Sequence, residues 1–156
     1  MTSMAILRDE RDLLWLALSE VRAQGDDIWF DVHFLARDEP GEPPEPFLST
    51  CGFREPRAGL RELLRNLAGA VTGDVSAIRH DPIAEGLSME LKARGGPSDL
   101  VFEIVLWLDL TRMSRAMKAR AARGRHQAGL RMFVRRDALE EFRAALFTLA
   151  FSGDPS

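Results

Sequence analysis

The chain has 156 residues, of which 46% are hydrophobic and 29% are charged, and its formal net charge is −3. This length predicts a single domain, spanning residues 1–156, and the apolar fraction excludes a disordered chain. No apolar run approaches the roughly 18 residues of a membrane-spanning helix, and residues 1–20 lack the basic start of a signal peptide. The one cysteine, Cys51, excludes an internal disulfide and a cysteine-based metal cluster. We therefore expect a cytoplasmic protein without a metal or a cofactor.

The charges are unevenly distributed along the chain. Residues 111–136 contain nine bases and no acid, so this stretch carries a charge of +9. The rest of the chain carries 12 bases and 24 acids, which gives −12. The near-neutral total therefore hides a basic block within an acidic body, and the block is expected to bind either an acidic surface or a polyanion.

The first two predicted strands lie on either side of a short turn. Apolar residues alternate within residues 13–21, although the same residues also fit a helical stripe. A strand is favoured because residues 23–27 read as a turn and a second strand follows at once. In that second strand, residues 28–36, one face is apolar and the other carries Asp31 and His33.

An acidic loop and an amphipathic helix come next. Residues 38–46 hold four prolines and four acids, so they are expected to form a solvated loop that cannot continue a sheet. Residues 47–53 are expected to form a short edge strand. The helix is predicted over residues 57–72, with Pro56 before it and Gly73 as its left-handed stop. Its buried stripe follows the helical spacing i, i+3, i+4, i+7 and i+11: Leu60, Leu63, Leu64, Leu67 and Val71.

Three more strands and a second helix complete the chain. The strands are predicted over residues 87–92, 100–110 and 130–134, and the middle one has apolar residues on both faces. That pattern predicts a central strand which contacts a partner or is partly covered on its second side. The last helix is expected to begin at Asp137, because Asp137 and Glu140 have the spacing of a capping box.

Together these elements predict an α+β fold. We expect a two-layer sandwich in which a mostly antiparallel sheet of about five to six strands carries two main helices on one face. The acidic proline-rich loop at 38–46 and a basic insert at 111–129 interrupt this domain. No internal repeat is visible in the sequence.

The polar residues form no pattern that is typical of catalysis or of metal binding. His80, Asp81 and Pro82 are expected to form a turn, and Cys51 is expected to be a structural residue because no base flanks it. The histidines lie in three separate elements and lack metal-ligand spacing: His33, His80 and His126.

Glu103 and Asp109 share one face of the strand at 100–110, but six residues separate them by roughly 20 Å. This distance is too long for a shared acid–base site, so the face is expected to be wet or to receive arginines from the basic block.

The basic block allows three interpretations. It forms a solvated connection between two strands, it contacts an acidic partner or its own acidic domain, or it contacts phosphates of a nucleic acid. The residues of the nucleic-acid interpretation are Arg115, Lys118, Arg120 and Arg123. No aromatic residue alternates with these bases, which argues against stacking on single strands.

Two of the three tryptophans fall opposite the main apolar face of their strands. If the strands of Trp29 and Trp107 share a sheet, both indoles are expected on its helix-free face, where they would mark a partner surface.

The order of these elements and the hydrophobic spacing within them resemble those of a family of small bacterial proteins. The stretches that carry the resemblance are residues 28–36, 60–73, 87–91, 101–110 and 130–149. They are similar to those of the WapI-associated immunity-type family and related small bacterial domains. The resemblance implies an intracellular inhibitor that binds and neutralises a cognate toxin without catalysis, although the basic insert after Leu110 is atypical.

The sequence therefore predicts a binding protein and not an enzyme. Its expected partner is a cognate protein toxin, which a rigid surface would cover, and an acidic face would occupy a basic nuclease cleft. The predicted partner-binding residues are Asp26, Asp27, Trp29, Asp31, Asp38, Glu39, Glu42 and Glu45. The alternatives are a nucleic-acid-binding or defence-associated adaptor and a small enzyme with a pocket between sheet and helices. The oligomeric state is left open, since a second copy in a homodimer could cover the two-sided central strand, and no membrane contact is expected.

Overall fold

The computed structural model describes residues 4–80, 87–96, 99–109 and 127–152. These residues form eight strands and two helices. In chain order they are β1 (Met4–Arg8), β2 (Leu14–Gln24), β3 (Asp27–Ala36), β4 (Glu45–Pro56), α1 (Arg57–Thr72), β5 (Ala77–His80), β6 (Leu87–Arg94), β7 (Val101–Asp109), β8 (Gln127–Arg135) and α3 (Arg136–Phe151).

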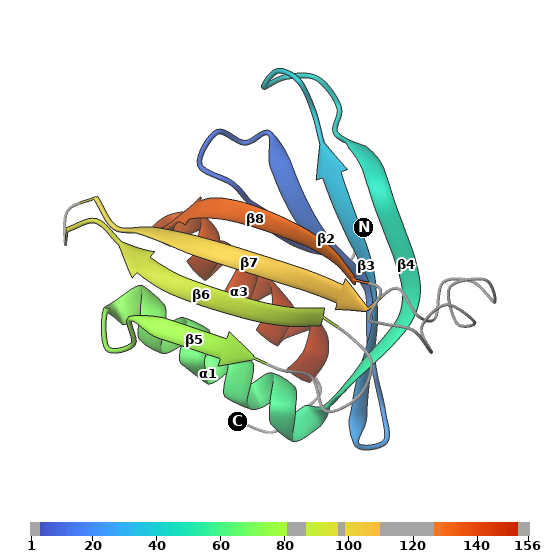
Figure 1. Ribbon diagram of the computed structural model, residues 1–156. Helices are drawn as coiled ribbons and strands as arrows, with labels where there is room; N and C mark the ends of the chain where they lie inside the picture. Colours follow the sequence, from blue (N-terminus) through green and yellow to red (C-terminus); the bar gives the residue numbers. More distant parts are fainter. Residues whose placement is uncertain (1–3, 81–86, 97–98, 110–126, 153–156) are drawn as a thin grey trace.

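The strands form two antiparallel sheets whose members are neighbours in sequence (Figure 1). The first sheet has the order β1-β2-β3-β4 and the second has the order β5-β6-β7-β8. Among the described elements each sheet is followed by one helix, so the order of four strands and a helix occurs twice. The predicted α+β sandwich is confirmed. The described strands number eight rather than five or six. They form two sheets, each a meander of four strands, and the first strands of these meanders are the short strands β1 and β5.

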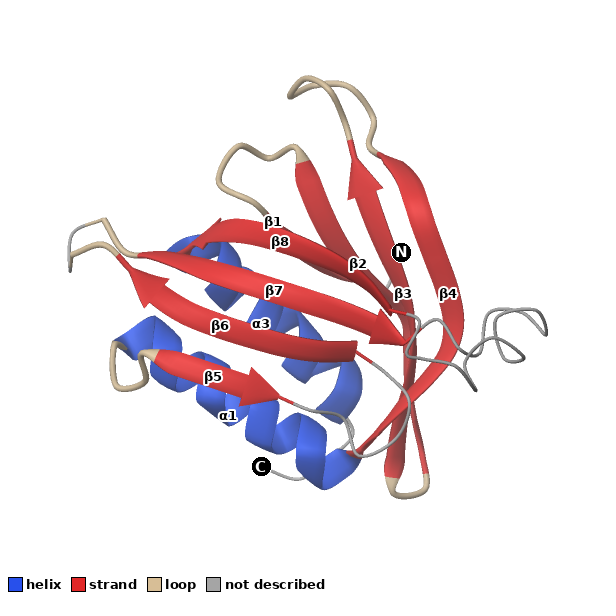
Figure 2. Ribbon diagram, in the orientation of Figure 1, coloured by secondary structure: helices blue, strands red, loops and turns tan. Residues whose placement is uncertain are grey.

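Helix α3 lies at the centre of the fold. Figure 2 shows both helices behind the second sheet, and α3 packs mainly on β1 and β2 of the first sheet. Helix α1 lies beside α3 and next to β5. The two sheets approach each other near β8, where the amide of Glu10 donates to the carbonyl of Phe133 at 2.7 Å.

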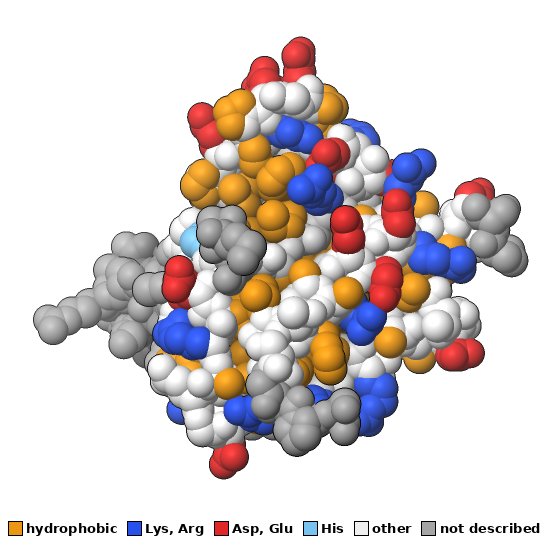
Figure 3. All heavy atoms as spheres, turned by 180° about the vertical axis from the view of Figure 1, so that it is seen from behind, with side chains coloured by type: hydrophobic (Ala, Val, Ile, Leu, Met, Phe, Trp, Pro, Cys, Tyr) orange, Lys and Arg blue, Asp and Glu red, His pale blue; other side chains and the backbone are white. Residues whose placement is uncertain are grey.

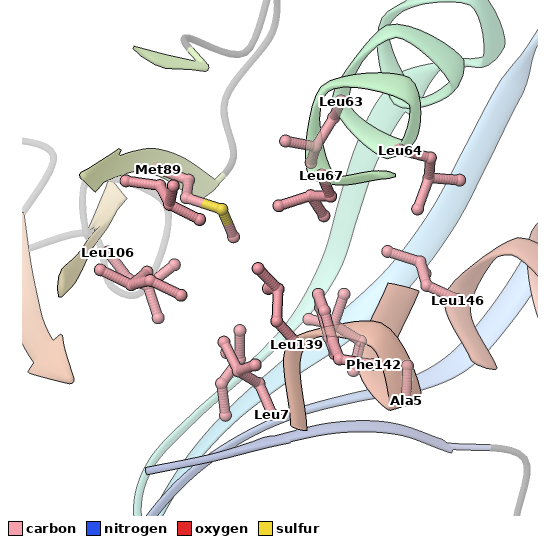
Figure 4. Close-up of a cluster of buried hydrophobic side chains, with 14 of the residues drawn as sticks. Ala5, Leu7, Leu63, Leu64, Leu67, Met89, Leu106, Leu139, Phe142 and Leu146 are labelled. Atoms are coloured by element: carbon pink, nitrogen blue, oxygen red, sulfur yellow. The ribbon is translucent and has the colours of Figure 1, made fainter. Parts of the chain in front are cut away.

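One cluster of buried apolar side chains joins all these elements. Figure 4 shows part of it: Ala5 and Leu7 of β1, Leu63, Leu64 and Leu67 of α1, Met89 and Leu106 of the second sheet, and Leu139, Phe142 and Leu146 of α3. The inward residues of β3 and of β6 to β8 alternate with exposed or half-buried ones, as the sequence pattern predicted. In β2 the alternation is interrupted, because Ala17 is buried between Leu16 and Leu18.

Helix α1 has the predicted bounds. The four leucines of its predicted stripe are buried, together with Ala70, whereas Val71 is half-buried. Gly73 has φ 89° and its amide donates to the carbonyl of Ala70, which confirms the left-handed stop.

The capping box predicted for the last helix is wrong. Helix α3 begins at Arg136, directly after β8, and no side chain caps it. Asp137 instead accepts a hydrogen bond from the amide of Ala138 at 3.0 Å, and Glu140 binds Arg143 with 2.7 Å between Oε2 and Nε. The strand continues into the helix without a turn, so the N-cap position falls on Arg135 and not on Asp137. A guanidinium cannot accept the hydrogen bond that a capping box requires.

The acidic proline-rich loop is shorter than expected. Glu45 and Pro46 already belong to β4, where they pair with Ala36 and Leu35. The proline is tolerated because β4 is an edge strand, in which a residue without an amide hydrogen does not interrupt a ladder on both sides. Residues 38–44 form the loop proper, and Cys51 lies within β4, as expected of an edge-strand residue.

Candidate interaction surfaces

The outer surface of the first sheet carries apolar side chains on both sides of a polar middle, and charged residues at its ends. We call it the first-sheet face; its residues alternate with buried ones along the strands. It comprises Met4, Ile6, Arg8, Trp15, Ser19, Trp29, Asp31, His33, Leu35 and Ser49. Figure 3 views the molecule from behind and shows hydrophobic side chains gathered in its upper half, where Figure 1 places β2, β3 and β4.

Two arginines flank Trp15, one of the apolar side chains of this face. The guanidinium groups of Arg8 and Arg37 lie 4.6 and 5.2 Å from the ring of Trp15. Arg37 also binds the carboxylate of Asp12 at 2.7 Å, and the indole nitrogen of Trp15 donates to that carboxylate at 2.7 Å. These contacts hold the indole in a fixed orientation next to Leu35, its neighbour across the strands.

A polar chain crosses the middle of the same face. The Nε2 atom of His33 is 2.8 Å from the hydroxyl of Ser19, and its Nδ1 atom is 2.9 Å from the hydroxyl of Ser49. In a serine hydrolase the second ring nitrogen binds a carboxylate that orients the imidazole. Here it faces a second hydroxyl, so the three side chains connect β2, β3 and β4 rather than forming a catalytic triad.

The predicted partner-binding acids occupy two ends of the first sheet. Asp26 and Asp27 lie at the β2–β3 turn, and the second group lies at and beyond the other end of β3: Asp38, Glu39, Glu42 and Glu45. The ten residues of β3 separate the two groups by about 33 Å. The acids therefore lie at opposite ends of the first-sheet face and do not form one continuous acidic patch.

Trp29 and Asp31 lie between these two groups on β3. The guanidinium of Arg54 is 5.8 Å from the ring of Trp29 and pairs with Asp27 at 3.7 Å. The carboxylate of Asp31 accepts a hydrogen bond from the amide of Gly52 at 3.1 Å, where β4 bulges.

The structure brings part of the second acidic group together. Asp38, Glu42 and Glu45 line an open hollow of about 330 Å³ with Arg37. Arg37 also donates to the backbone carbonyl of Glu42 at 3.0 Å. This link between β3 and the loop was not visible in the sequence, because the bond joins a side chain to a carbonyl.

The outer surface of the second sheet has a different character. We call it the second-sheet face; it comprises Arg79, Ser88, Glu90, Lys92, Arg94, Val101, Glu103, Val105, Trp107, Gly129, Arg131, Phe133 and Arg135. It carries five bases and two acids, a net charge of +3. This surface faces the reader in Figure 1, where β5 to β8 lie in front of the helices.

Glu103 organises the centre of this face. Arg94 donates to its carboxylate at 2.9 Å, and Arg131 donates to the other oxygen. These hydrogen bonds, first from Arg94 and then from Arg131, hold the pKa of Glu103 below its ordinary value. The expectation that this face receives an arginine from the basic block is confirmed by Arg131.

Two buried acids lie away from both faces. The carboxylate of Asp9 accepts hydrogen bonds from the amides of Leu13 and Leu14, at 2.7 and 3.1 Å, and so shapes the β1–β2 turn. Glu55 lies 3.2 Å from the Nε2 atom of His80. The prediction of a loop for His80 is wrong, because this residue ends β5, while Asp81 and Pro82 lie outside the described residues.

The remaining sequence predictions are resolved only in part. Trp29 and Trp107 belong to different sheets, so the expectation that they share one sheet face is wrong. The residues of the nucleic-acid interpretation lie outside the described part of the chain: Arg115, Lys118, Arg120 and Arg123.

The chain matches no family model, no curated protein and no solved structure. The resemblance to the WapI-associated family stays a prediction. Within the described ranges, no helix has the length and apolar character to cross a membrane. In the same ranges, no three histidine, cysteine, aspartate or glutamate side chains are grouped as metal ligands.

Proposed function

We propose that this chain is a non-enzymatic binding protein of the immunity type, which covers the active surface of a cognate protein toxin with its first-sheet face. The observation that carries the proposal is the distribution of side chains on that face. Tryptophan and arginine among apolar side chains, bordered by charged ends, are typical of a protein interface. Such an inhibitor would act in the cytoplasm of the cell that makes the toxin.

The size of the face supports a protein partner. Four strands with the length of β3 cover about 33 Å by 19 Å, or roughly 600 Å², before the flanking loops are added. A specific protein interface covers about 800 Å² on each partner. The face and its two acidic ends are therefore large enough for one standard interface.

Rigidity supports a steric mechanism. The Ser19–His33–Ser49 chain links side chains of β2, β3 and β4. The Arg37–Asp12 pair joins the β1–β2 connection to the residue that follows β3. A surface whose rotamers are already fixed loses little conformational entropy when it binds. The acids at the two ends would mainly raise the association rate and select a basic partner.

Co-expression tests this proposal. The chain is produced together with the toxin encoded next to its gene, and growth rescue and the dissociation constant of the purified complex are measured. Leu35→Arg places a charge beside Trp15, among the apolar side chains of the first-sheet face. It is expected to weaken the complex by at least about tenfold, because the guanidinium must be buried unpaired. Phe147→Arg on the exposed side of α3 is the matched control, since Phe147 is 45% exposed and lies on neither face.

The control is expected to rescue growth as the unchanged chain does. Absence of a complex with the unchanged chain, or equal affinity of the Leu35→Arg variant, contradicts the proposal. Circular dichroism of both variants shows whether either change unfolds the protein.

A further inference from the structure

The second-sheet face attracts anions, and its charge is set by residues of three neighbouring strands. Lys92 and Arg94 project from β6, and Arg131 and Arg135 from β8. Glu103, on β7 between them, engages Arg94 and Arg131 and neutralises part of this charge. The sign of the whole face stays positive, so an anionic partner is favoured over a neutral one.

Trp107 lies flat on this sheet because its cross-strand neighbour is Gly129. A Cβ atom at Gly129 would lie 2.6, 2.7 and 3.0 Å from three adjacent carbons of the six-membered ring. Nearly equal distances to three adjacent atoms mean that the ring presents its face, not its edge, to the backbone. The indole is still 40% exposed, so its opposite face is open to a planar ligand.

Phe133 supplies a second exposed ring. It alternates with Arg131 and Arg135 along β8 and is 40% exposed. Its partner across the strands is Glu103, four residues before Trp107 on β7, so the two rings lie about 13 Å apart along the strands. Arg131 lies between the two ring positions on β8, and Arg135 lies beyond Phe133. Two rings at this spacing, with basic side chains between and beyond them, can contact successive parts of one extended chain.

We infer that the second-sheet face binds single-stranded nucleic acid, with Trp107 and Phe133 stacking on unpaired bases and the basic side chains contacting phosphates. Exposed aromatic rings on a four-stranded antiparallel sheet, bordered by cations, provide both interactions. A duplex offers its phosphates but keeps its bases stacked on one another. An acidic polypeptide would satisfy the cations, yet it supplies no series of planar groups for the two rings.

This inference goes beyond the proposed function and concerns the opposite sheet, so the two can fail separately. It also revises an expectation from the sequence. An aromatic residue does alternate with basic residues, but it does so on β8 and not among Arg115 to Arg123. On β8 the period of two places Phe133 between two arginines on the same face.

Fluorescence anisotropy of labelled oligonucleotides tests the inference with the full chain. The probes are oligothymidine and oligouridine of about 15 nucleotides, a duplex of the same length, and labelled polyglutamate. We expect either single strand to bind more tightly than the duplex and the polyglutamate. The affinity should fall linearly with salt on a double-logarithmic scale, by about 0.7 for each phosphate contacted. The tighter of the two single strands identifies DNA or RNA as the source.

Four variants separate stacking from charge. Trp107→Ala and Phe133→Ala should each weaken binding by about fivefold or more without changing the salt slope. Gly129→Ala should have an effect similar to that of Trp107→Ala, because the added methyl group displaces the indole. Arg135→Ala should lower the salt slope by about 0.7. Phe147→Ala, a change of the same type at a ring of similar exposure on α3, is the control and should bind normally.

Three results would overturn the inference. The first is that neither single strand binds. The second is that polyglutamate or the duplex binds as tightly as the single strands. The third is that Trp107→Ala and Phe133→Ala bind as the unchanged chain does, which would mean that basic residues elsewhere in the chain bind the nucleic acid. Thermal unfolding of each variant establishes that the fold is intact.

Discussion

Glu103 accepts hydrogen bonds from one arginine on each side of it, Arg94 of β6 and Arg131 of β8. Both contacts exist only in the folded sheet, since nine and twenty-eight residues separate the arginines from the carboxylate along the chain. The lowered pKa of Glu103 therefore couples its ionisation to the stability of the second sheet.

This coupling has a defined sign. A carboxyl group whose pKa is lower in the folded state stabilises the fold above its unfolded pKa, about 4.3 for glutamate. That contribution is lost as the pH falls through the lower, folded pKa. Glu103→Gln removes it at every pH. We therefore expect the variant to be less stable than the unchanged chain at neutral pH, with the difference shrinking in acid.

Urea unfolding at neutral pH and at about pH 3 measures this difference. Glu62→Gln, the same change at an exposed position of α1, is the control. A stability difference between the Glu103 variant and the unchanged chain that stays constant with pH would contradict the assigned role. Arg94 and Arg131 would then not stabilise the ionised carboxylate of Glu103 in the folded protein.

Single residues of the site were predictable to different degrees. The outward position of Trp29, Asp31, Trp107 and Phe133 follows from the period of two. The residues that lie beside them on adjacent strands cannot be predicted in this way, because the register between strands depends on turns and bulges. The bulge between Ser19 and Arg22 shifts the pairing of β2 with β3, and nothing in the local sequence marks it. The Ser19–His33–Ser49 chain was therefore missed.

Helix α3 is the element that receives contacts from both halves of the fold. Leu139, Phe142 and Leu146 face β1 and α1 and lie in one cluster with the second sheet (Figure 4). Phe142 is 1% exposed. Its side chain therefore contributes to the packing of several elements at once.

Truncation of Phe142 tests this position. Phe142→Ala is expected to lower the free energy of unfolding by about 3–5 kcal/mol, because the lost transfer energy adds to the cost of the cavity. Phe147→Ala, one turn later and 45% exposed, should change it by less than about 1 kcal/mol. Denaturant unfolding gives both values. Similar losses in the two variants would mean that α3 is not packed as described.

Elements with long alternating or helical patterns were predictable from sequence, and short ones were not. Strand β1 has five residues and β5 has four, too few for periodicity to distinguish a strand from a loop. Pro46 suggested a loop, but an edge strand accepts proline. The capping box predicted at Asp137 does not form, because β8 runs directly into α3. The spacing of Asp137 and Glu140 in the sequence cannot show where the preceding strand ends.

At the scale of the whole molecule, two meanders of four strands place two unlike surfaces on one core. The repeat of four strands and a helix was hidden in the sequence, because β1 and β5 are the strands that the periodicity missed. Without β1 and β5 the remaining six strands read as one sheet, in which Trp29 and Trp107 would share a face. Separate sheets give the chain an apolar face with acidic ends and a basic face with aromatic rings.

The central claim is that the first-sheet face covers a protein toxin, and hydroxyl-radical footprinting of the complex tests it most directly. Oxidation of side chains is compared between the free chain and its complex with the toxin encoded beside it. We expect Met4 and Trp29 to be protected in the complex, while Trp107 and Phe133 stay as reactive as in the free chain. Protection of Trp107 and Phe133, with Met4 and Trp29 unchanged, would contradict the claim.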